Sequence, residues 1–428
     1  MSTSNSPEGA RVRARYWIET ARPLEAAAAT MAGEQSTGTF VRVAGETDAL
    51  RERYAARVDS LTPLGETSVP SLPGAWHPRG DNARWRTAEV TLSWPLHNFG
   101  VSLPNLLATV AGNLWELNAF SGMRLLDLTI PADFLRAYPG PQFGVPGTRE
   151  LSGVHGRPLI GTIIKPSVGL SPAETAARVA DLVAAGVDFI KDDELQADGP
   201  HCPFEARLGA VMQVLRTHAE RTGQRVLYAV NITGEIDQML RRHERVVAEG
   251  GNCVMVSLHS VGFAGLTALR AQCQVPIHGH RNGWGLLGRS PAIGVSFPAW
   301  QKLWRLAGID HVHVNGLDNK FCESNDSVIA SARECLTPMF SPPSPGCQIM
   351  PVFSSGQTAC QVPGTWHALG SVDLIHACGG GIIGHPGGAP AGVRSLRQAW
   401  EAAVAGLSLS DYAREHRELA EALEHFGR

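Results

Sequence analysis

The chain of 428 residues has few of the features that mark membrane or nucleic-acid-binding proteins. No apolar run approaches the ~20 residues that a membrane-spanning helix needs. The opening stretch, MSTSNSPEGARVRARYW, lacks the apolar core of a signal peptide and is expected to form a short disordered tail. The formal net charge of -3 gives no reason to expect nucleic acid or an anionic membrane as a partner.

Closely paired cysteines are also lacking. The eight cysteines all lie between Cys202 and Cys378, and no two of them form a CxxC pair. Scattered thiols predict a reduced, cytoplasmic chain with neither a disulfide framework nor a zinc site. The sequence does contain enough apolar residues, 43% of the chain, for a sizeable core. At this length we expect two domains, or one large barrel with an addition.

Two sequence patterns divide the chain. Residues 10–137 mix strand-like runs, such as AEVTLSWPL, with helical ones, such as DALRERYAARVDSL, in no regular alternation, which is typical of an α+β domain. The segment YPGPQFGVPGTRELSG is rich in proline and glycine and is predicted to be a connector. We therefore predict an N-terminal domain over residues 1–140 and a C-terminal domain over residues 141–428.

In the second part, short apolar runs alternate with helical segments. The predicted strands are LIGTIIKP, VDFIKDDE, RVLYAVNI, NCVMVSLH, VPIHGHR, HVHVNG, QIMPVFSSG and LIHACGGG. The helical segment SPAETAARVADLVAAG starts with a serine cap, a proline and a glutamate at favourable positions. Eight strands with crossovers over ~250 residues predict a (β/α)8 barrel of the α/β class. A doubly wound open sheet stays possible, because periodicity cannot show closure.

Polar residues follow nearly every predicted strand. They are Lys165; Lys191, Asp193 and Glu194; Asn231; His278, His280 and Arg281; His313; Ser354 and Ser355; and Gly379, Gly380 and Gly381. The carboxyl ends of barrel strands meet at one face, where barrels of this type build their active sites. We therefore expect these residues to contribute to one site.

The run KDDE at residues 191–194 is the candidate metal site. Lys191 and Asp193 share one face of an extended strand, while Asp192 points to the other. Glu194 follows where the strand leaves the barrel. Two carboxylates with backbone or water oxygens suit Mg²⁺. A solvated strand end is the alternative.

Two further motifs favour binding of a phosphorylated substrate. His278 and His280 share a face as a zinc pair would, but the neighbouring Arg281 would repel a cation, so hydroxyl or phosphate contacts fit better. A plain core role for either histidine stays open. The segment CGGGIIGHPGG lets backbone N–H groups approach an anion closely, and the loops after strands seven and eight of barrels commonly hold phosphate.

In order along the chain, GTIIKPSVGL, GVDFIKDDE, IHGHR, HVH and GGGIIGHPGG resemble motifs in the large subunit of ribulose-bisphosphate carboxylase/oxygenase (RuBisCO). The resemblance covers nearly the whole chain, including EQSTGTF and AGNLWELNAFSGMRLLDLTIP in the N-terminal part. It implies an N-terminal α+β (ferredoxin-like) domain followed by a C-terminal (β/α)8 barrel that carries the catalytic site.

The resemblance also implies a metal site and acid–base groups. Lys191 matches the lysine that takes up CO₂ as a carbamate, and with residues matching Asp193 and Glu194 it holds Mg²⁺. Lys165 matches the lysine that acts in proton transfer during enolisation. His280 matches a second acid–base group.

Substrate contacts and a shared site are implied in the same way. Arg281 and His313 match one phosphate site, and Ser354 is a further candidate contact. The remaining matches are Thr39, Gly356, Gly379 and Gly380 at the other phosphate site, Lys320 as the mobile lysine after the sixth strand, and Glu34, Thr39 and Asn113 as residues that reach into a neighbouring subunit. This last set implies an obligate homodimer with active sites shared between subunits.

Departures from the carboxylases define the subgroup. Ser167 replaces the second lysine of KPK, Phe40 replaces a tryptophan, and Trp284 lies where a phosphate-binding histidine is expected. The loop VNGLDNKFCESND does not resemble the CO₂-gating loop. This profile predicts a RuBisCO-like protein of form IV that enolises a ketose or 3-oxo sugar-acid monophosphate, as an isomerase, decarboxylase or transcarboxylase, without fixing CO₂.

Three alternatives remain. Ser167 and Trp284 oppose a genuine ribulose-bisphosphate carboxylase. Asn113, where methionine-salvage diketo-methylthiopentyl-phosphate enolases have lysine, opposes that activity. Retention of Lys191 and Glu194 opposes a non-catalytic binding protein.

Overall fold

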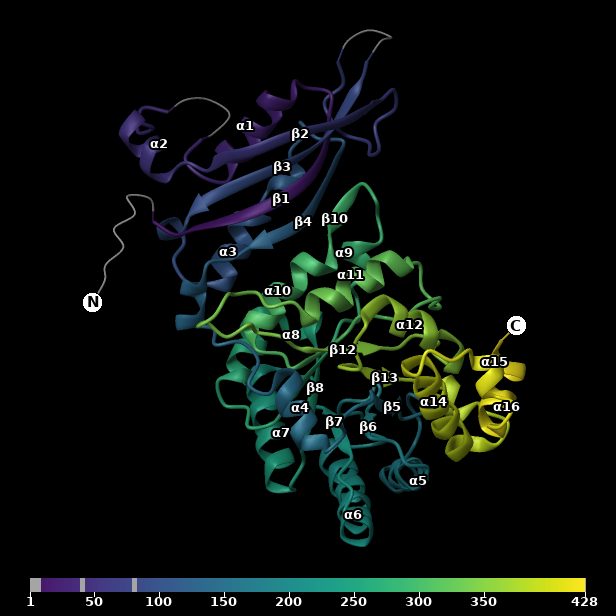
Figure 1. Cartoon of the computed structure of the whole chain (residues 1–428). Coiled ribbons are helices and arrows are strands. Elements are labelled where there is room, and N and C mark those ends of the chain that lie inside the picture. Colours follow the sequence, from purple (N-terminus) through teal and green to yellow (C-terminus); the bar gives the residue numbers. More distant parts are fainter. Residues whose placement is uncertain (1–8, 39–42, 79–82, 428) are drawn as a thin grey trace. The chain divides into compact units, whose positions relative to one another are not determined.

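The structure is a computed structural model that describes residues 9–38, 43–78 and 83–427 (Figure 1). Thr39 and Phe40, which the sequence analysis singled out, lie outside these ranges. The chain forms two compact units. The N-terminal unit comprises Met1–Pro139, Gly283–Leu306 and Met339–Pro345, and the barrel unit comprises Gly140–Asn282, Ala307–Pro338 and Gly346–Arg428.

The N-terminal unit contains a mixed sheet with the strand order β10-β4-β1-β3-β2. Its strands are β1 (Arg11–Thr20), β2 (Arg57–Thr67), β3 (Trp85–Pro95), β4 (Gly122–Thr129) and β10 (Ile293–Val295). Its helices are α1 (Leu24–Glu34), α2 (Asp48–Tyr54), α3 (Leu103–Val110), α9 (Gly285–Gly288) and most of α10 (Phe297–Ala307), with short 3-10 turns η1 (Leu96–Asn98), η2 (Leu114–Glu116) and η3 (Ala132–Arg136). Strand β1 pairs antiparallel with β3 and β4, so alternate side chains such as Val12, Ala14 and Tyr16 are buried in the core of this unit.

The structure corrects three local predictions in this part of the sequence. Arg11–Trp17, expected in a tail, belongs to β1. The predicted helix over residues 48–61 ends at Tyr54, and Arg57 begins β2, because pairing with β3 overrides the helical composition. The predicted connector contains the helix α4 (Gly144–Ser152), and Gly153, the residue that follows it, has φ 64°. Glycine suits this left-handed position at the end of a helix. The proline and glycine residues of the segment had led to the prediction of a loop.

Strand β10 was not predicted. It lies between two barrel strands in sequence, yet it pairs in parallel with β4, and Figure 1 shows it in green beside the blue strands of the N-terminal sheet. Three residues are too few to give a periodic signal.

The barrel unit contains a closed, parallel, eight-stranded barrel, as predicted. Its strands are β5 (Leu159–Ile163), β6 (Phe189–Lys191), β7 (Leu227–Asn231), β8 (Cys253–Ser257), β9 (Ile277–His280), β11 (His311–His313), β12 (Met350–Phe353) and β13 (Ile375–Ala377). Each lies within one of the eight predicted runs. Closure excludes the doubly wound open sheet.

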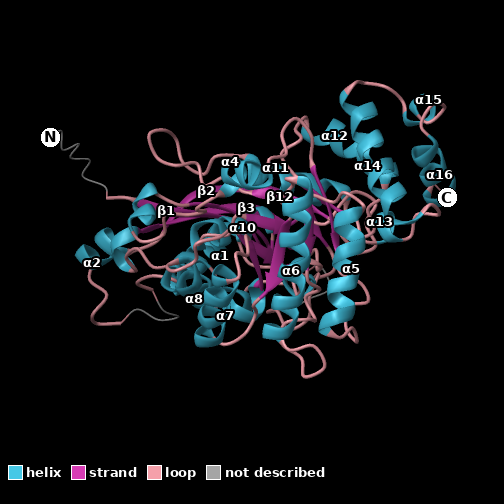
Figure 2. Cartoon of the chain, turned by 90° about the horizontal axis from the view of Figure 1, so that it is seen from below, coloured by secondary structure: helices cyan, strands magenta, loops and turns pink. Residues whose placement is uncertain are grey.

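Helices connect and cover the barrel strands. They are α5 (Pro172–Ala184), α6 (Phe204–Thr222), α7 (Ile236–Ala248), α8 (Leu258–Arg270), α11 (Asn325–Leu336), α12 (Val362–Leu369), α13 (Gly380–Ile383) and α14 (Gly388–Val404), followed by α15 (Leu409–Tyr412) and α16 (Arg417–Phe426); η4 (Ala359–Gln361) precedes α12. Figure 2 shows α5 and α6 in cyan alongside the magenta strands. The predicted capping box starts α5: Ser171 accepts a hydrogen bond from the backbone of Glu174, whose side chain accepts one in return.

The barrel interior is a packed apolar core. Its buried residues include Leu159, Phe189, Met255 and Val352, each from a different strand. This core fixes the strand ends, and with them the polar side chains that follow. No helix in the described ranges is long and apolar enough to cross a membrane.

Candidate active site

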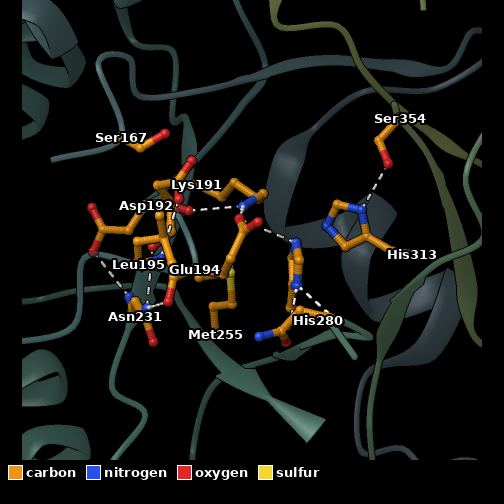
Figure 3. A network of polar contacts seen from close by, with 12 residues as sticks. Ser167, Lys191, Asp192, Glu194, Leu195, Asn231, Met255, His280, His313 and Ser354 are labelled. Atoms are coloured by element: carbon orange, nitrogen blue, oxygen red, sulfur yellow. Dashed lines mark hydrogen bonds and ion pairs between the residues drawn. The ribbon is translucent and has the colours of Figure 1, made fainter. Parts of the chain in front are cut away.

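Lys191 lies at the end of β6, and its side chain is buried, with only 1% exposed. Its Nζ donates a hydrogen bond to the backbone oxygen of Asp192 at 2.9 Å and lies 3.6 Å from Oε2 of Glu194. Figure 3 shows the side chains of Lys191, Glu194 and His280 directed toward one another. Burial lowers the pKa of the Lys191 amine from its usual value, while Glu194 and Asp193 oppose that shift.

Asp193 faces a second lysine. Nζ of Lys165 donates to Oδ2 of Asp193 at 2.6 Å and to Oγ of Ser167 at 2.7 Å. Burial raises the pKa of the Asp193 carboxyl, but the hydrogen bonds from Lys165 and from the Leu195 backbone outweigh it, and the net pKa lies below its usual value. Asp193 is therefore an ionised carboxylate with a cation bound to it.

Asp192 points away from this cluster, as strand alternation predicted. Its carboxylate accepts hydrogen bonds from the hydroxyl of Tyr228 at 2.6 Å and the guanidinium of Arg207 at 3.3 Å. Burial would lower the pKa of Arg207, but Asp192 outweighs it, and the pKa lies above its usual value. Asp192 and Arg207 thus form a buried structural pair.

His280 completes the cluster around Glu194. Its Nε2 lies 3.4 Å from Oε2 of Glu194, and its Nδ1 lies 3.2 Å from both the backbone nitrogen and Oδ1 of Asn282. Burial, aided by the charge of Lys191, lowers the pKa of His280 to about 4. The imidazole is therefore neutral at pH 7, with one ring nitrogen carrying a proton and the other able to accept one.

Two more histidines from neighbouring strands form a chain with a serine. Nε2 of His278 lies 2.9 Å from Nε2 of His313, so one ring donates and the other accepts. Nδ1 of His313 lies 2.9 Å from Oγ of Ser354, a contact drawn in Figure 3. Burial lowers the pKa of both imidazoles well below its usual value. His278 is thus bonded to His313, an arrangement unlike the zinc pair with His280 that spacing alone allowed.

Arg281 has an acidic partner that the sequence analysis did not single out. Its guanidinium contacts Oε2 of Glu323 in a short ion pair, and both side chains are largely buried. The two residues are 42 positions apart, so no spacing rule connected them. The sequence signal that could have indicated the pair was the acidic residue Glu323 in the loop after β11, the sixth barrel strand.

The predicted phosphate loops lie after β12 and β13. Gly356 has φ +93°, a conformation that favours glycine, and the backbone N–H of Lys320 donates to the oxygen of Ser355 at 3.1 Å. Gly379 and Gly380 start the single turn α13, where backbone N–H groups lack intrahelical acceptors. Lys320 is exposed, and its Nζ lies 5.3 Å from the centre of the Phe321 ring. The structure therefore brings Gly356 and Lys320 close together.

Glu34 and Asn113 are exposed residues of the N-terminal unit. Glu34 ends α1 and Asn113 precedes η2. Nε2 of Gln35 donates to the backbone oxygen of Ala111 at 3.3 Å, which joins the two segments. Thr39, predicted with them, lies outside the described residues.

Trp284, also in the N-terminal unit, caps α9 and is 9% exposed. Its ring packs edge-to-face against the ring of Phe297, with an interplanar angle of 69° and centroids 4.9 Å apart. Phe297 belongs to the same unit.

The described residues contain no group of three or more His, Cys, Asp or Glu side chains placed to hold a metal ion. Asp193 and Glu194 supply two carboxylates, and a carbamate on Lys191 would add a third anionic group of oxygens. Such an all-oxygen set suits Mg²⁺. The burial of Lys191, its lowered pKa and its 3.6 Å distance to Glu194 fit this use of the lysine.

Comparisons with known proteins match the chain over both units. The family model for the ribulose bisphosphate carboxylase large chain, catalytic domain, matches residues 144–426. The model for the N-terminal domain of the same chain matches residues 4–134.

Individual relatives are similar along their full lengths. The chain is 55% identical to the 3-oxo-isoapionate-4-phosphate transcarboxylase/hydrolase of Xanthobacter autotrophicus, covering 96% of this chain and 98% of that protein. It is 42% identical to the 3-oxo-isoapionate-4-phosphate decarboxylase of Rhizobium etli, covering 96% and 97%. Among solved structures, a rubisco-like protein from Burkholderia fungorum is 47% identical with a TM-score of 0.91, covering 97% of this chain and 100% of that one.

Proposed function

Because the chain belongs to the family of the ribulose bisphosphate carboxylase large chain, as one of its RuBisCO-like proteins, we propose that it is a Mg²⁺-dependent enzyme acting on a 3-oxo sugar-acid monophosphate. The substrate class is that named for the two relatives, 3-oxo-isoapionate 4-phosphate. Transcarboxylation with hydrolysis is favoured over simple decarboxylation, because identity to the transcarboxylase/hydrolase is 55% and to the decarboxylase 42%. The observation that carries the chemistry is the buried Lys191 beside Glu194.

Lys191 is suited to become a carbamate. Only the neutral amine reacts with CO₂, and burial lowers the pKa of Lys191, which increases the neutral fraction at a given pH. The carbamate, Asp193 and Glu194 would then hold Mg²⁺. When bound, the ion would supply positive charge next to the 3-oxo oxygen of the substrate.

The chain's own groups suit the proton steps of the reaction. When the bond between the carboxyl carbon and C2 of a 3-oxo acid breaks, the electron pair spreads onto the 3-oxo oxygen, and C2 must then gain a proton. Lys165 is a cation held at Asp193 and is half exposed, so it can donate that proton. His280 is neutral at pH 7, since its pKa is about 4, and can accept a proton from a substrate hydroxyl. Whether the carboxyl carbon is released or transferred distinguishes the two relatives' activities.

The single phosphate is assigned to the loops after β12 and β13. Gly356, Gly379 and Gly380 let backbone N–H groups approach a dianion, with Thr39 and Lys320 as the matching side chains. Ser354 and His313 remain candidates for substrate hydroxyls.

The active enzyme is proposed to be a cytoplasmic homodimer. Glu34 and Asn113 are exposed at the ends of joined segments, as residues that complete a partner's site must be. Thr39 would join them.

The test uses 3-oxo-isoapionate 4-phosphate labelled with ¹³C in its carboxyl group. We expect Mg²⁺-dependent consumption, with the label recovered in a new organic species before free bicarbonate if transfer precedes hydrolysis. Lys191→Met should stop consumption, while Ser408→Ala, on the C-terminal surface, should not. Fixation of labelled bicarbonate onto ribulose 1,5-bisphosphate, without turnover of the 3-oxo acid, would contradict the proposal.

A further inference from the structure

Glu323 makes an unusually complete set of contacts for a loop carboxylate. Oε2 accepts from the guanidinium of Arg281 and from Nδ2 of Asn315 at 2.6 Å. Oε1 accepts from Oγ of Ser327 at 2.8 Å. Its side chain is 13% exposed and that of Arg281 is 5% exposed. The carboxylate, in the loop after β11, is therefore held in a fixed and largely buried position beside Arg281, which follows β9.

His313, the neighbouring histidine, adds no positive charge at neutral pH. Burial lowers the pKa of His313, so this imidazole is neutral at pH 7, and it is bonded to His278 and Ser354. The positive charge of Arg281 is balanced by the negative charge of Glu323. A phosphate dianion entering here would meet one guanidinium and one carboxylate, and would have to displace the carboxylate from three donors.

We infer that Glu323 is a specificity-determining residue that takes the place of a second phosphate, so that this end of the site accepts an uncharged, hydroxyl-bearing group. The inference rests on the proposed function, in which the substrate carries one phosphate. The Glu323 carboxylate, which belongs to the barrel unit, would explain why the site prefers a substrate with one phosphate. Trp284, which lies where the carboxylases have a phosphate-binding histidine, packs against Phe297.

A purely structural role for Glu323 makes a different prediction. The loop that carries Glu323 also carries Lys320. Within this loop, Nδ2 of Asn319 donates hydrogen bonds to the backbone oxygens of Gly316 at 2.9 Å and Glu323 at 3.1 Å. If Glu323 only anchored the loop, its loss would weaken all ligands equally. If it excludes an anion, its loss should strengthen bisphosphate binding alone.

The experiment compares ribulose 5-phosphate with ribulose 1,5-bisphosphate, which differ by one phosphate, by calorimetric titration of the full chain with Mg²⁺ and bicarbonate. In wild type, we expect the bisphosphate to bind no more tightly than the monophosphate. In Glu323→Gln, which keeps the shape and removes the charge, we expect bisphosphate Kd to fall about tenfold and monophosphate Kd to change less than about threefold. Glu323→Ala should shift the ratio in the same direction.

Asp318→Asn is the matched control, because Asp318 is an exposed acid of the same loop whose contact is with Asn325. It should leave the ratio unchanged. An unchanged ratio in both Glu323 variants, equal loss of both ligands with the fold retained, or tighter bisphosphate binding by wild type would overturn the inference. Failure of the 3-oxo acid assay would leave these binding ratios readable, so the two failures are distinguishable.

Discussion

Nζ of Lys165 lies 2.6 Å from Oδ2 of Asp193, so a proposed proton donor is bound to a proposed metal ligand. The carboxylate is buried, whereas the lysine side chain is 46% exposed and can swing away. Lys165 would therefore compete with a divalent cation bound at the same oxygen.

We predict that Lys165→Met binds Mn²⁺ about tenfold more tightly than wild type, which corresponds to about 1.4 kcal/mol, while turnover is lost. Removal of the ammonium leaves Asp193 without its cation. Titration followed by electron paramagnetic resonance measures free Mn²⁺ directly. Ser167→Ala, which removes only the second contact of Lys165, should bind Mn²⁺ as wild type does. Unchanged or weaker binding by Lys165→Met would show that the ion pair does not compete.

Lys191→Met should abolish turnover, by about 1,000-fold or more, without loss of the fold. Methionine matches the volume of the lysine stem and removes an amine whose charged form is disfavoured by burial, while Glu194, which loses this partner, is 31% exposed to solvent. We expect a thermal midpoint equal to or above that of wild type, measured by circular dichroism. Wild-type turnover in this variant would refute the carbamate proposal.

Asp192→Ala should behave in the opposite way, although the two positions are adjacent. It leaves Arg207 as a buried cation without its carboxylate, at a cost of about 3–5 kcal/mol in the free energy of unfolding. The folded fraction should keep most of its turnover, since Asp192 points away from Lys191. Urea unfolding and assays below the transition measure the two effects. A variant that is stable but inactive would place Asp192 in the site.

Mixed dimers test the shared site. Asn113→Ala and Lys165→Ala subunits are each expected to be inactive alone, but a hybrid dimer would contain one site with both residues intact. Co-expression with two affinity tags isolates the hybrid, which should recover a quarter to a half of wild-type turnover per dimer, on the order of one site in two. An inactive purified hybrid would place all groups in a single chain.

Stability should fall in acid because buried histidines resist protonation. Burial lowers the pKa of His376 to about 3, and its Nδ1 accepts a hydrogen bond from Nε1 of Trp400 at 3.0 Å. Since the folded-state pKa lies below the unfolded value of about 6.5, this stability is present above that pH and is lost as pH falls toward 3. Between pH 7.5 and 5.0 the loss is about 2 kcal/mol for this histidine.

His376→Gln keeps an acceptor for Trp400 and cannot titrate. The decrease in unfolding free energy between pH 7.5 and 5.0, measured with urea, should therefore be about 2 kcal/mol smaller than in wild type. His425→Gln, an exposed change on α16, is the control and should leave the decrease as it is. An equal pH dependence in all three proteins would contradict the assignment.

The sequence predicted the barrel well because eight buried strands with helical crossovers leave a regular signal. It also placed Lys191, Glu194 and His280 at strand ends, and closure of the barrel brings them together. Contacts between distant positions left no such signal. The Arg281–Glu323 pair and the His278–His313 contact depend on side-chain geometry across strands, which spacing along one strand cannot give.

The predictions failed where pairing partners decide the structure. Arg57 follows a helical stretch, but it begins β2, which pairs with β3. Because most of β2 is exposed, its sequence does not alternate between apolar and polar residues. The helix α4 was not predicted because its sequence contains two glycines and a proline, which are typical of loops. Local composition and tertiary pairing conflict in β2, whereas in α4 a helix forms despite a loop-like composition.

Strand β10 has a consequence for how the protein is synthesised. It is the edge partner of β4, but it follows β9, the fifth barrel strand along the chain. Domains usually fold in order as they leave the ribosome. Here the N-terminal sheet cannot acquire its last strand until residue 295 has emerged, after β5 to β9. A gene fragment that stops at residue 140 would encode a sheet with an open edge at β4, and such edges invite pairing with other chains.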